Sequence, residues 1–332
     1  MNTEDRPARF AGGPSAAAAA SASRTANRTR RLSLMIGASA LLASVAGCGG
    51  GSTTIPEGST PSAPAATTSR DCVAKRNVAG HDVVLLIGQS NMAGYGAYLV
   101  PAFDNPDPRV RQWTRGGTIA EATEPLDHPQ IPFNNGRIGP GLAFGKAYIA
   151  DLPASRSVLL VPGAWGGTGF SSGSWNPGDS LYEQAVQRTK AALALNPAGN
   201  CLAGILWSQG ETDALNQMPE ASYRSALRTM ISSMRSALAS GSVVPNDIPF
   251  VLGQFSPDWI APAPTAAQQA ILNVINETPG AVSTTAIAST GGLTSNLTQG
   301  LENGSIHLDA ASQRTYGSRY REALKAAVAN SR

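Results

Sequence analysis

Cysteine, histidine and charge are all scarce in this chain of 332 residues. Three cysteines are too few for a disulfide-dense scaffold, and three histidines leave few candidates for a catalytic base. Residues 1–70 hold seven arginines and three acidic residues, which leaves 18 basic and 19 acidic residues in the remainder. A body this close to neutral has no excess of positive charge to bind a phosphate backbone, so nucleic acid is not an expected partner.

The N-terminal region resembles an export signal. Three arginines at 28–31 precede an apolar run of 15 residues at 32–46, which is short of the ~20 residues that a membrane span needs. The run ends in Val45-Ala46-Gly47-Cys48, which resembles the lipobox of bacterial lipoproteins, where the cysteine is acylated and becomes the new N-terminus. A plain secretory signal or a short buried helix is the alternative, and Arg30-Arg31 also hints at a twin-arginine signal.

The composition divides the chain into three parts. Residues 1–47 are predicted to be a lipoprotein signal peptide, and residues 48–70 are rich in Gly, Ser, Thr, Pro and Ala, which predicts a flexible tether. Residues 71–332 form the predicted folded domain. We therefore expect an exported protein that a lipid on Cys48 holds at a bacterial membrane, facing the periplasm or the cell surface.

The two remaining cysteines, Cys72 and Cys201, are predicted to pair. Cys72 lies just upstream of the first predicted strand and Cys201 opens a central one. Starts of neighbouring parallel strands share one edge of a sheet, so an exported domain can join them by a disulfide. Two buried free thiols are the alternative.

Apolar runs alternate with helical periodicity from residue 71 onward. Strands are predicted at 83–87, 157–161, 202–207, 249–253 and, more weakly, 281–287. Helical stripes are predicted at 142–152, 181–189 and 223–238, and Asp309 is a predicted cap of a C-terminal helix. This alternation favours a parallel α/β sheet with helices on both faces. Residues 98–137, rich in Pro, Asp, Asn and Gly, are predicted to be a long loop at the rim of a substrate site.

Polar and Gly-rich residues follow several predicted strands, where such sheets bind their ligands. These are GQSNMAG at 88–94, PGAWGGT at 162–168, SQGETD at 208–213 and, before the last helix, SIHL at 305–308. A hydroxyl nucleophile needs a base within hydrogen-bond reach. His81 precedes the first strand and His128 lies in the long loop, so His307 is the best candidate base.

A set of donors for an oxyanion is also present at these strand ends. The main-chain N–H of Ser90, an N–H from Gly166 or Gly167, and the side-chain amide of Gln209 are the candidates. For the glycine pair the alternative is an ordinary tight turn, and for Gln209 it is a residue that caps a helix.

These motifs together resemble the SGNH-hydrolase superfamily, and within it carbohydrate esterase family six and the sialic-acid acetylesterase-like domains. GQSNMAGYG (88–96), GPGLAFGKA (139–147), PGAWGGTGF (162–170), ILWSQGETDA (205–214) and SIHLDAASQRTYG (305–317) carry the resemblance. It implies a three-layer, flavodoxin-like α/β/α fold and a Ser-His mechanism without metal or cofactor. Ser90 is then the nucleophile, His307 the general base and acid, and Gln209 and one of the two glycines oxyanion donors.

One position departs from the wider family. Many SGNH enzymes have Asp three residues before the catalytic His, where this chain has Gly304. Some related esterases use the Glu of the QGE motif, which implies that Glu211 orients His307. Asp213, Asn303 and a main-chain carbonyl are the alternatives. Activity can survive without a carboxylate partner, because oxyanion stabilisation and binding still contribute.

We therefore expect a serine esterase that removes acetyl groups from a saccharide through an acetyl-enzyme on Ser90. Acetyl xylan, another plant polysaccharide and O-acetylated sialic acid remain open as substrates. Asn91 is a candidate substrate contact, and Trp165, Trp175, Phe170 and Tyr95 could stack on sugar rings or simply pack in the protein. A short-chain lipase or arylesterase, and a non-catalytic glycan-binding lipoprotein, are the competing hypotheses.

Overall fold

A computed structural model describes residues 68–130, 136–241, 243–301 and 304–331. The predicted signal peptide, the lipidation site at Cys48 and nearly all of the predicted tether lie outside these residues. Among the helices of the described residues, none combines the length and the hydropathy needed to cross a membrane.

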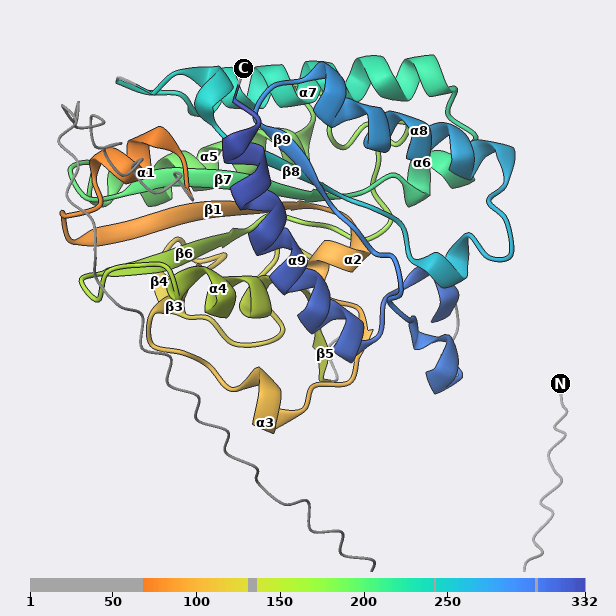
Figure 1. Ribbon diagram of the computed structural model, residues 1–332, viewed down its shortest axis with the longest axis horizontal. Coiled ribbons are helices and arrows are strands. Elements are labelled where there is room, and N and C mark those ends of the chain that lie inside the picture. Colours follow the sequence, from red (N-terminus) through yellow and green to blue (C-terminus); the bar gives the residue numbers. More distant parts are fainter. Residues whose placement is uncertain (1–67, 131–135, 242, 302–303, 332) are drawn as a thin grey trace, which may run out of the picture. The chain divides into compact units, whose positions relative to one another are not determined.

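A seven-stranded sheet forms the centre of the domain (Figure 1). Its order is β4-β3-β6-β1-β7-β8-β9, and every neighbouring pair is parallel except β3 and β4. The strands are β1 (Gly80–Gly88), β3 (Val110–Trp113), β4 (Ile119–Glu121), β6 (Arg156–Pro162), β7 (Cys201–Ser208), β8 (Phe250–Gly253) and β9 (Thr285–Ala288). A small antiparallel pair joins β2 (Gly96–Ala97) to β5 (Arg137–Ile138).

Helices cover both faces of this sheet, because successive side chains of a strand point to opposite faces. Val83, Leu85 and Ile87 of β1 belong to a core that includes α5 (Ser180–Ala194), α7 (Glu220–Leu238) and α8 (Ala266–Ala281). Val84 and Leu86 belong to a second core, with α4 (Gly141–Ile149) and α9 (Ala310–Ala329). Figure 1 shows α9 crossing the sheet on the side of α4. The predicted three-layer α/β/α fold is confirmed.

Most of the expected elements form, with small changes at their ends. Asp309 accepts a hydrogen bond from Ser312 N, as predicted for the cap of α9. The fifth strand is shorter than expected, because α8 runs to Ala281 and a turn at 282–284 precedes the strand. Helix α8 was not predicted, although Thr265 and Gln268 form a capping box at its start.

The prediction of one long loop at 98–137 is wrong. This stretch contains α3 (Pro101–Asp104), β3 and β4, and its last residue begins β5. Val110 and Trp113 of β3 are buried, and the strand pairs with β6. The sequence does not predict β3 and β4, because each is a short run among Pro and Gly residues. Both strands extend the sheet on one side.

The domain begins before the predicted boundary at residue 71. Thr68 and Ser69 are buried, and Ser69 Oγ donates to Leu202 O at 2.6 Å. The helix α1 (Arg70–Ala74) follows and carries Cys72. Cys72 and Cys201 form a disulfide with their Cα atoms 5.1 Å apart, as predicted. The bond fastens α1 to the start of β7.

The order of the strands places a topological switch point at the end of β1. The chain continues from β1 to strands on one side and then returns to β7 on the other, so the loops after β6 and β7 diverge around the end of β1. Parallel sheets bind ligands at such switch points. Two short helices begin here, α2 (Ser90–Ala93) and α6 (Glu211–Leu215).

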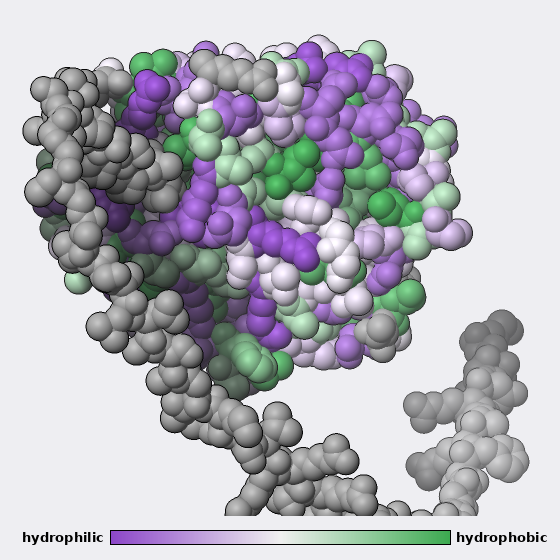
Figure 2. Space-filling view, viewed as in Figure 1, coloured by the Kyte–Doolittle hydropathy of each residue, from purple (hydrophilic) through white to green (hydrophobic). Residues whose placement is uncertain are grey.

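Four 3-10 turns complete the secondary structure of the described chain: Pro245–Asp247, Pro257–Trp259, Asn296–Gln299 and Gly304–Ile306. Figure 2 shows hydrophilic residues over much of the face in view, with apolar residues scattered among them. The large apolar side chains that are exposed, such as Phe103, Leu215 and Leu297, come from separate elements.

Candidate active site

Ser90 lies directly beyond β1, as the first residue of α2. Gly88 makes this turn possible, because its φ of 118° suits glycine and a Cβ there would collide with Ser208 O of β7. Gln89 N donates to Ser208 O at 2.7 Å, which ties the turn to the end of β7. The sharp turn leaves Ser90 4% exposed, with its side chain directed at the loop that follows β9.

His307 meets Ser90 from that loop. Its Nε2 lies 3.0 Å from Ser90 Oγ, which is hydrogen-bond distance. Asn296 N donates to His307 O at 2.8 Å, and Ser295 and Leu308 form an isolated β-bridge. The pair of residues predicted as nucleophile and base is therefore brought together from positions 217 residues apart.

Two groups beside the imidazole shape its chemistry. The ring of Tyr95 lies 4.7 Å from that of His307, centroid to centroid, and Arg137 Cζ lies 5.8 Å from the Tyr95 centroid. Burial, and then the charge of Arg137, lower the pKa of His307 from 6.5 to about 4. The imidazole is therefore neutral at neutral pH and can accept a proton from Ser90.

Glu211 does not contact His307. Its Oε1 accepts a hydrogen bond from Asn91 Nδ2 at 3.0 Å, and its buried Oε2 has no hydrogen-bond partner. Burial raises the pKa of Glu211 to about 7. The orienting role expected of Glu211 does not take the form of a direct contact with the imidazole, because Asn91 bonds both to Glu211 and to the His307 loop.

The other predicted partners of His307 are accounted for in different ways. Asp213 is buried and accepts hydrogen bonds from Phe170 N, Ser171 N and Gln209 Nε2. Asn303 lies outside the described residues. Within the described part of the chain, no carboxylate or carbonyl accepts a hydrogen bond from His307 Nδ1, and Ser90 is the only hydrogen-bond partner of the imidazole.

The glycine pair predicted for the oxyanion follows β6, which lies next to β1 in the sheet. Trp165 N donates to Gly88 O at 3.0 Å, which holds the start of this segment against the end of β1. Gly166 N donates to Gln130 Oε1 at 2.6 Å, so that N–H is already occupied. In the described structure neither Ser90 N nor Gly167 N donates to a protein acceptor, which makes these two the available donors.

Gln209 is occupied inside the protein. Its Nε2 donates to Asp213 Oδ2 at 2.8 Å and to Thr168 O at 3.2 Å, and the residue is 1% exposed. These contacts disagree with the prediction that its amide faces an oxyanion, because both of its hydrogens have acceptors. Gln209 instead holds the segment that contains Gly167 against the end of β7.

Three of the predicted substrate contacts have different environments. Trp165 is 38% exposed and remains available to a ligand. Trp175 is fully buried, packs edge-on against Trp207 and donates from Nε1 to Thr168 Oγ1, so the prediction that it stacks on a sugar is wrong. Asn91 is 1% exposed, and both ends of its amide bond to protein groups.

Arg137 and Asn296 were not predicted as site residues. Asn296 donates from Nδ2 to Tyr95 O at 2.7 Å and accepts from Ala97 N at 3.0 Å, so it joins the tyrosine segment to the histidine loop. Neither residue belongs to a recognisable motif, and Arg137 enters the site only through the pairing of β5 with β2.

Cys72, Asp82 and Cys201 are the one group of potential metal ligands that comes close together in the described chain. Both thiols are consumed by the disulfide, so this group has no cysteine left to bind a metal.

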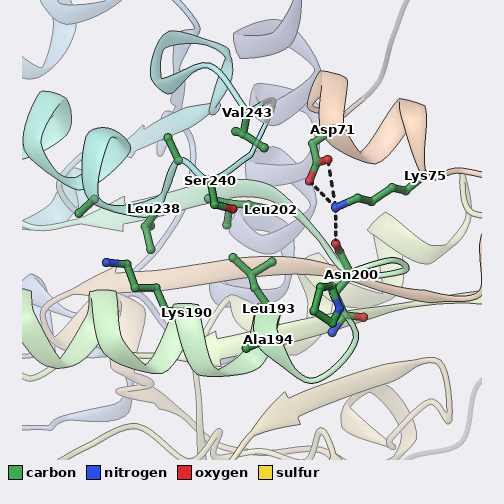
Figure 3. Close-up of a pocket in the computed structure, with 13 residues that line it drawn as sticks. Asp71, Lys75, Lys190, Leu193, Ala194, Asn200, Leu202, Leu238, Ser240 and Val243 are labelled. Atoms are coloured by element: carbon green, nitrogen blue, oxygen red, sulfur yellow. Dashed lines mark hydrogen bonds and ion pairs between the residues drawn. The ribbon is translucent and has the colours of Figure 1, made fainter.

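A separate cavity of about 330 Å³ lies at the opposite edge of the sheet (Figure 3). Leu193, Leu202 and Leu238 line it, and Lys75 reaches its edge, where Nζ donates to Asp71 and to Asn200 O. Asn200 and Leu202 lie at the start of β7, whereas the Ser90 site adjoins its end. This cavity contains no histidine and no paired nucleophile, so it is not a second copy of the site.

Comparison with known proteins agrees with the fold and with the strand-end motifs. Residues 80–326 match the family model described as carbohydrate esterase, sialic acid-specific acetylesterase. A protein of Arabidopsis thaliana named "Probable carbohydrate esterase" is 30% identical over 172 residues, which are 47% of this chain and 63% of that protein. The "Probable 9-O-acetyl-N-acetylneuraminic acid deacetylase" of Escherichia coli K12 is 29% identical over 195 residues, 46% of this chain and 59% of the other. The matches thus span about three fifths of these relatives.

Solved structures show the same fold. The crystal structure of NanS superposes with a TM-score of 0.63 at 23% identity, covering 74% of this chain and 96% of the other. The Arabidopsis thaliana structure gives a TM-score of 0.58 at 24% identity, covering 76% and 98%. Since the family model covers most of the chain, the conclusion is direct: this protein belongs to the carbohydrate esterase family of sialic acid-specific acetylesterases.

Proposed function

We propose that this protein is a serine esterase that hydrolyses acetyl esters on a saccharide through an acetyl-enzyme on Ser90. The observation that carries the proposal is the 3.0 Å contact between Ser90 Oγ and His307 Nε2 at the switch point of the sheet. The low pKa of His307, about 4, supports its role as a base at neutral pH. The family membership and the named relatives point to the same reaction class.

The reaction takes two steps. Ser90 Oγ attacks the acetyl carbonyl while its proton passes to His307 Nε2, and the N–H groups of Ser90 and Gly167 stabilise the oxyanion. The bond between the carbonyl carbon and the sugar oxygen then breaks, His307 protonates that oxygen so that it leaves as a hydroxyl, and the acetyl group stays on Ser90. Water attacks this ester with His307 again as base, and acetate leaves as Ser90 regains its proton.

Two substitutions test the nucleophile and the base. Ser90→Ala and His307→Ala should each reduce kcat on a chromogenic acetate ester by about 10³-fold or more. Ser318→Ala, which removes an exposed hydroxyl from α9, is the matched control and should be as active as the wild type. A folded Ser90→Ala protein with wild-type activity would refute the mechanism.

The competing functions give different results in two further assays. A lipase or arylesterase should prefer longer acyl chains, whereas an acetylesterase should lose activity as the chain lengthens from acetate. A non-catalytic glycan-binding protein should bind sugar but leave Ser90 unlabelled by a serine-reactive phosphonate.

Arg137 favours a substrate that carries a carboxylate. Its guanidinium lies over Tyr95, next to His307, and no acidic side chain of the described residues pairs with it. A guanidinium binds a carboxylate in a bidentate manner, and this pairing is strong where water is excluded. Of the sugars considered above, O-acetylated sialic acid has such a group and acetylated xylose does not.

The choice of sugar can be tested with the same residue. Arg137→Gln should raise KM for O-acetylated sialic acid by about tenfold or more and change KM for acetylated xylo-oligosaccharides little. Equal effects on both substrates would mean that Arg137 does not recognise a carboxylate.

We also propose that the protein is exported and held at a membrane by a lipid on Cys48. The disulfide between Cys72 and Cys201 supports an oxidising compartment. Metabolic labelling with an alkyne-bearing fatty acid should mark the wild type but not Cys48→Ala. Equal labelling of both would refute acylation at this residue.

A further inference from the structure

We propose that Asn91 is a positioning residue, which holds the His307 loop in register with Ser90 and joins it to Glu211. The inference rests on the proposed Ser-His reaction and assigns the residue next to the nucleophile a part in it. It also replaces the expectation that Asn91 contacts the substrate.

The amide of Asn91 bonds to the main chain on both sides of His307. Its Nδ2 donates to Ile306 O at 2.9 Å, and its Oδ1 accepts from Leu308 N at 3.0 Å. These two groups flank the histidine in sequence, so one planar side chain fixes both ends of the segment that carries the imidazole. Because Asn91 follows Ser90 in α2, the nucleophile and the base share this attachment.

Glu211 determines the orientation of this amide, that is, which main-chain group Nδ2 and Oδ1 each face. The second hydrogen of Nδ2 points at Glu211 Oε1, 3.0 Å away, and this carboxyl oxygen accepts it. With Nδ2 held between Glu211 and Ile306 O, Oδ1 must face Leu308 N. Gln313 Nε2 lies 3.4 Å from the same oxygen and favours the same orientation.

The burial of this group excludes water as a substitute. Asn91 and Glu211 are each 1% exposed, so a hydrogen bond lost here leaves a buried polar group without a partner. The loop would relax to recover its bonds, and His307 would move relative to Ser90. A displacement of about 1 Å between reacting groups can cost on the order of 100-fold in rate.

The test uses four variants: Asn91→Ala, Asn91→Asp, Glu211→Gln, and Asn91→Asp combined with Glu211→Gln. Asn91→Ala should lower kcat on a chromogenic acetate about 100-fold and leave KM within about threefold. It should also slow the labelling of Ser90 by a serine-reactive phosphonate, which needs no sugar site.

Reversing the polarity of the pair tests the part assigned to Glu211. Asn91→Asp places a carboxyl against Glu211 and removes the donor to Ile306 O, so its activity should fall further than that of Glu211→Gln. In the double variant, the amide introduced by Glu211→Gln can donate to the carboxylate introduced by Asn91→Asp, and about tenfold of the lost kcat should return. No recovery would overturn the role of Glu211.

Asn200→Ala is the matched control. Asn200 is a buried asparagine at the opposite edge of the sheet, where it donates to Ala192 O and accepts from His81 N. Its loss should lower the melting temperature as much as the loss of Asn91 while kcat stays unchanged. If Asn91→Ala does not fold, the comparison of Asn91→Asp with the double variant decides the question.

Each other outcome has a definite meaning. A higher KM with unchanged kcat in Asn91→Ala would make Asn91 a substrate contact and overturn the proposal, as would wild-type kinetics. If the wild type itself hydrolyses no acetate ester and takes no phosphonate label at Ser90, the proposed function fails, and the Asn91 inference fails with it. If the wild type is active and Asn91→Ala has the same kcat and KM, only the positioning role is refuted.

Discussion

The acid limb of the pH profile gives the sharpest test of the site, because it reports the environment of His307. The pKa of His307 is lowered from 6.5 to about 4, chiefly by burial and then by Arg137. That difference corresponds to roughly 3 kcal/mol in favour of the neutral imidazole. Since the free enzyme must hold His307 unprotonated, kcat/KM should be half-maximal near pH 4 and level above about pH 5.

Arg137→Gln separates the two causes. Removing the guanidinium should raise the pKa of His307, so the acid limb should move upward, but by less than about one pH unit because burial is the larger cause. High salt should move the wild-type limb in the same direction, because salt screens the charge of Arg137. The matched control is Arg319→Gln on α9, whose guanidinium bonds to Ser289 O and Gly291 O and does not act on His307.

The assay is hydrolysis of a soluble chromogenic acetate from pH 3 to pH 9. Samples held at each pH are returned to pH 7 and measured again, which separates loss of activity by protonation from loss by unfolding. A wild-type limb at pH 6.5 or above would refute the reasoning. It would show that a negative charge stabilises the imidazolium, as a carboxylate on Nδ1 would do.

Three further outcomes are expected. Replacing Cys72 and Cys201 by serine opens a loop of 129 residues and should lower the free energy of unfolding by about 2–5 kcal/mol, measured by denaturant titration of the full chain; an unchanged midpoint would contradict this. Gly304→Asp, which restores the residue that many SGNH enzymes have, should lower rather than raise kcat, because its Cβ would lie 2.9 Å from the main chain of Asn296. Trp165→Ala should raise KM for an acetylated oligosaccharide several-fold without changing kcat on a small aryl acetate, as its exposed ring predicts, and equal effects on both would argue against a sugar contact.

The sequence predicts the frame of this protein well, for a physical reason. The strand β1 has five consecutive apolar residues whose side chains belong to both cores. Such a run indicates a strand that is buried on both faces of a sheet. The pairing of Ser90 with His307 follows from topology and from the scarcity of histidine, because both residues lie beyond carboxyl ends of parallel strands and the positions of His81 and His128 exclude them. The disulfide is predicted in the same way, because Cys72 and Cys201 lie near the starts of neighbouring parallel strands, at the opposite edge of the sheet.

The roles of the supporting side chains could not be predicted in the same way. Gln209 and Asn91 stand in motifs at the expected edge of the sheet and Trp175 follows one of these motifs, yet all three are almost completely buried. A position beyond a strand end places a residue near the site, but the direction of its side chain depends on contacts with distant segments. Asp213 accepts a hydrogen bond from the amide of Gln209, and Thr168 accepts one from the indole of Trp175.

The missing aspartate changes what the rest of the site must do. Gly304 packs so closely on Asn296 that no side chain fits there, so the imidazole cannot be held by a residue on its own loop at that position. Within the described residues, its orientation comes from main-chain bonds to Asn91 and Asn296 and from the ring of Tyr95. An imidazole held in this way has the right place but no charge to stabilise its protonated form. In the proposed reaction, the N–H groups of Ser90 and Gly167 must then supply most of the stabilisation of the transition state, and loss of the Gly167 segment should cost more here than in an enzyme with a full triad.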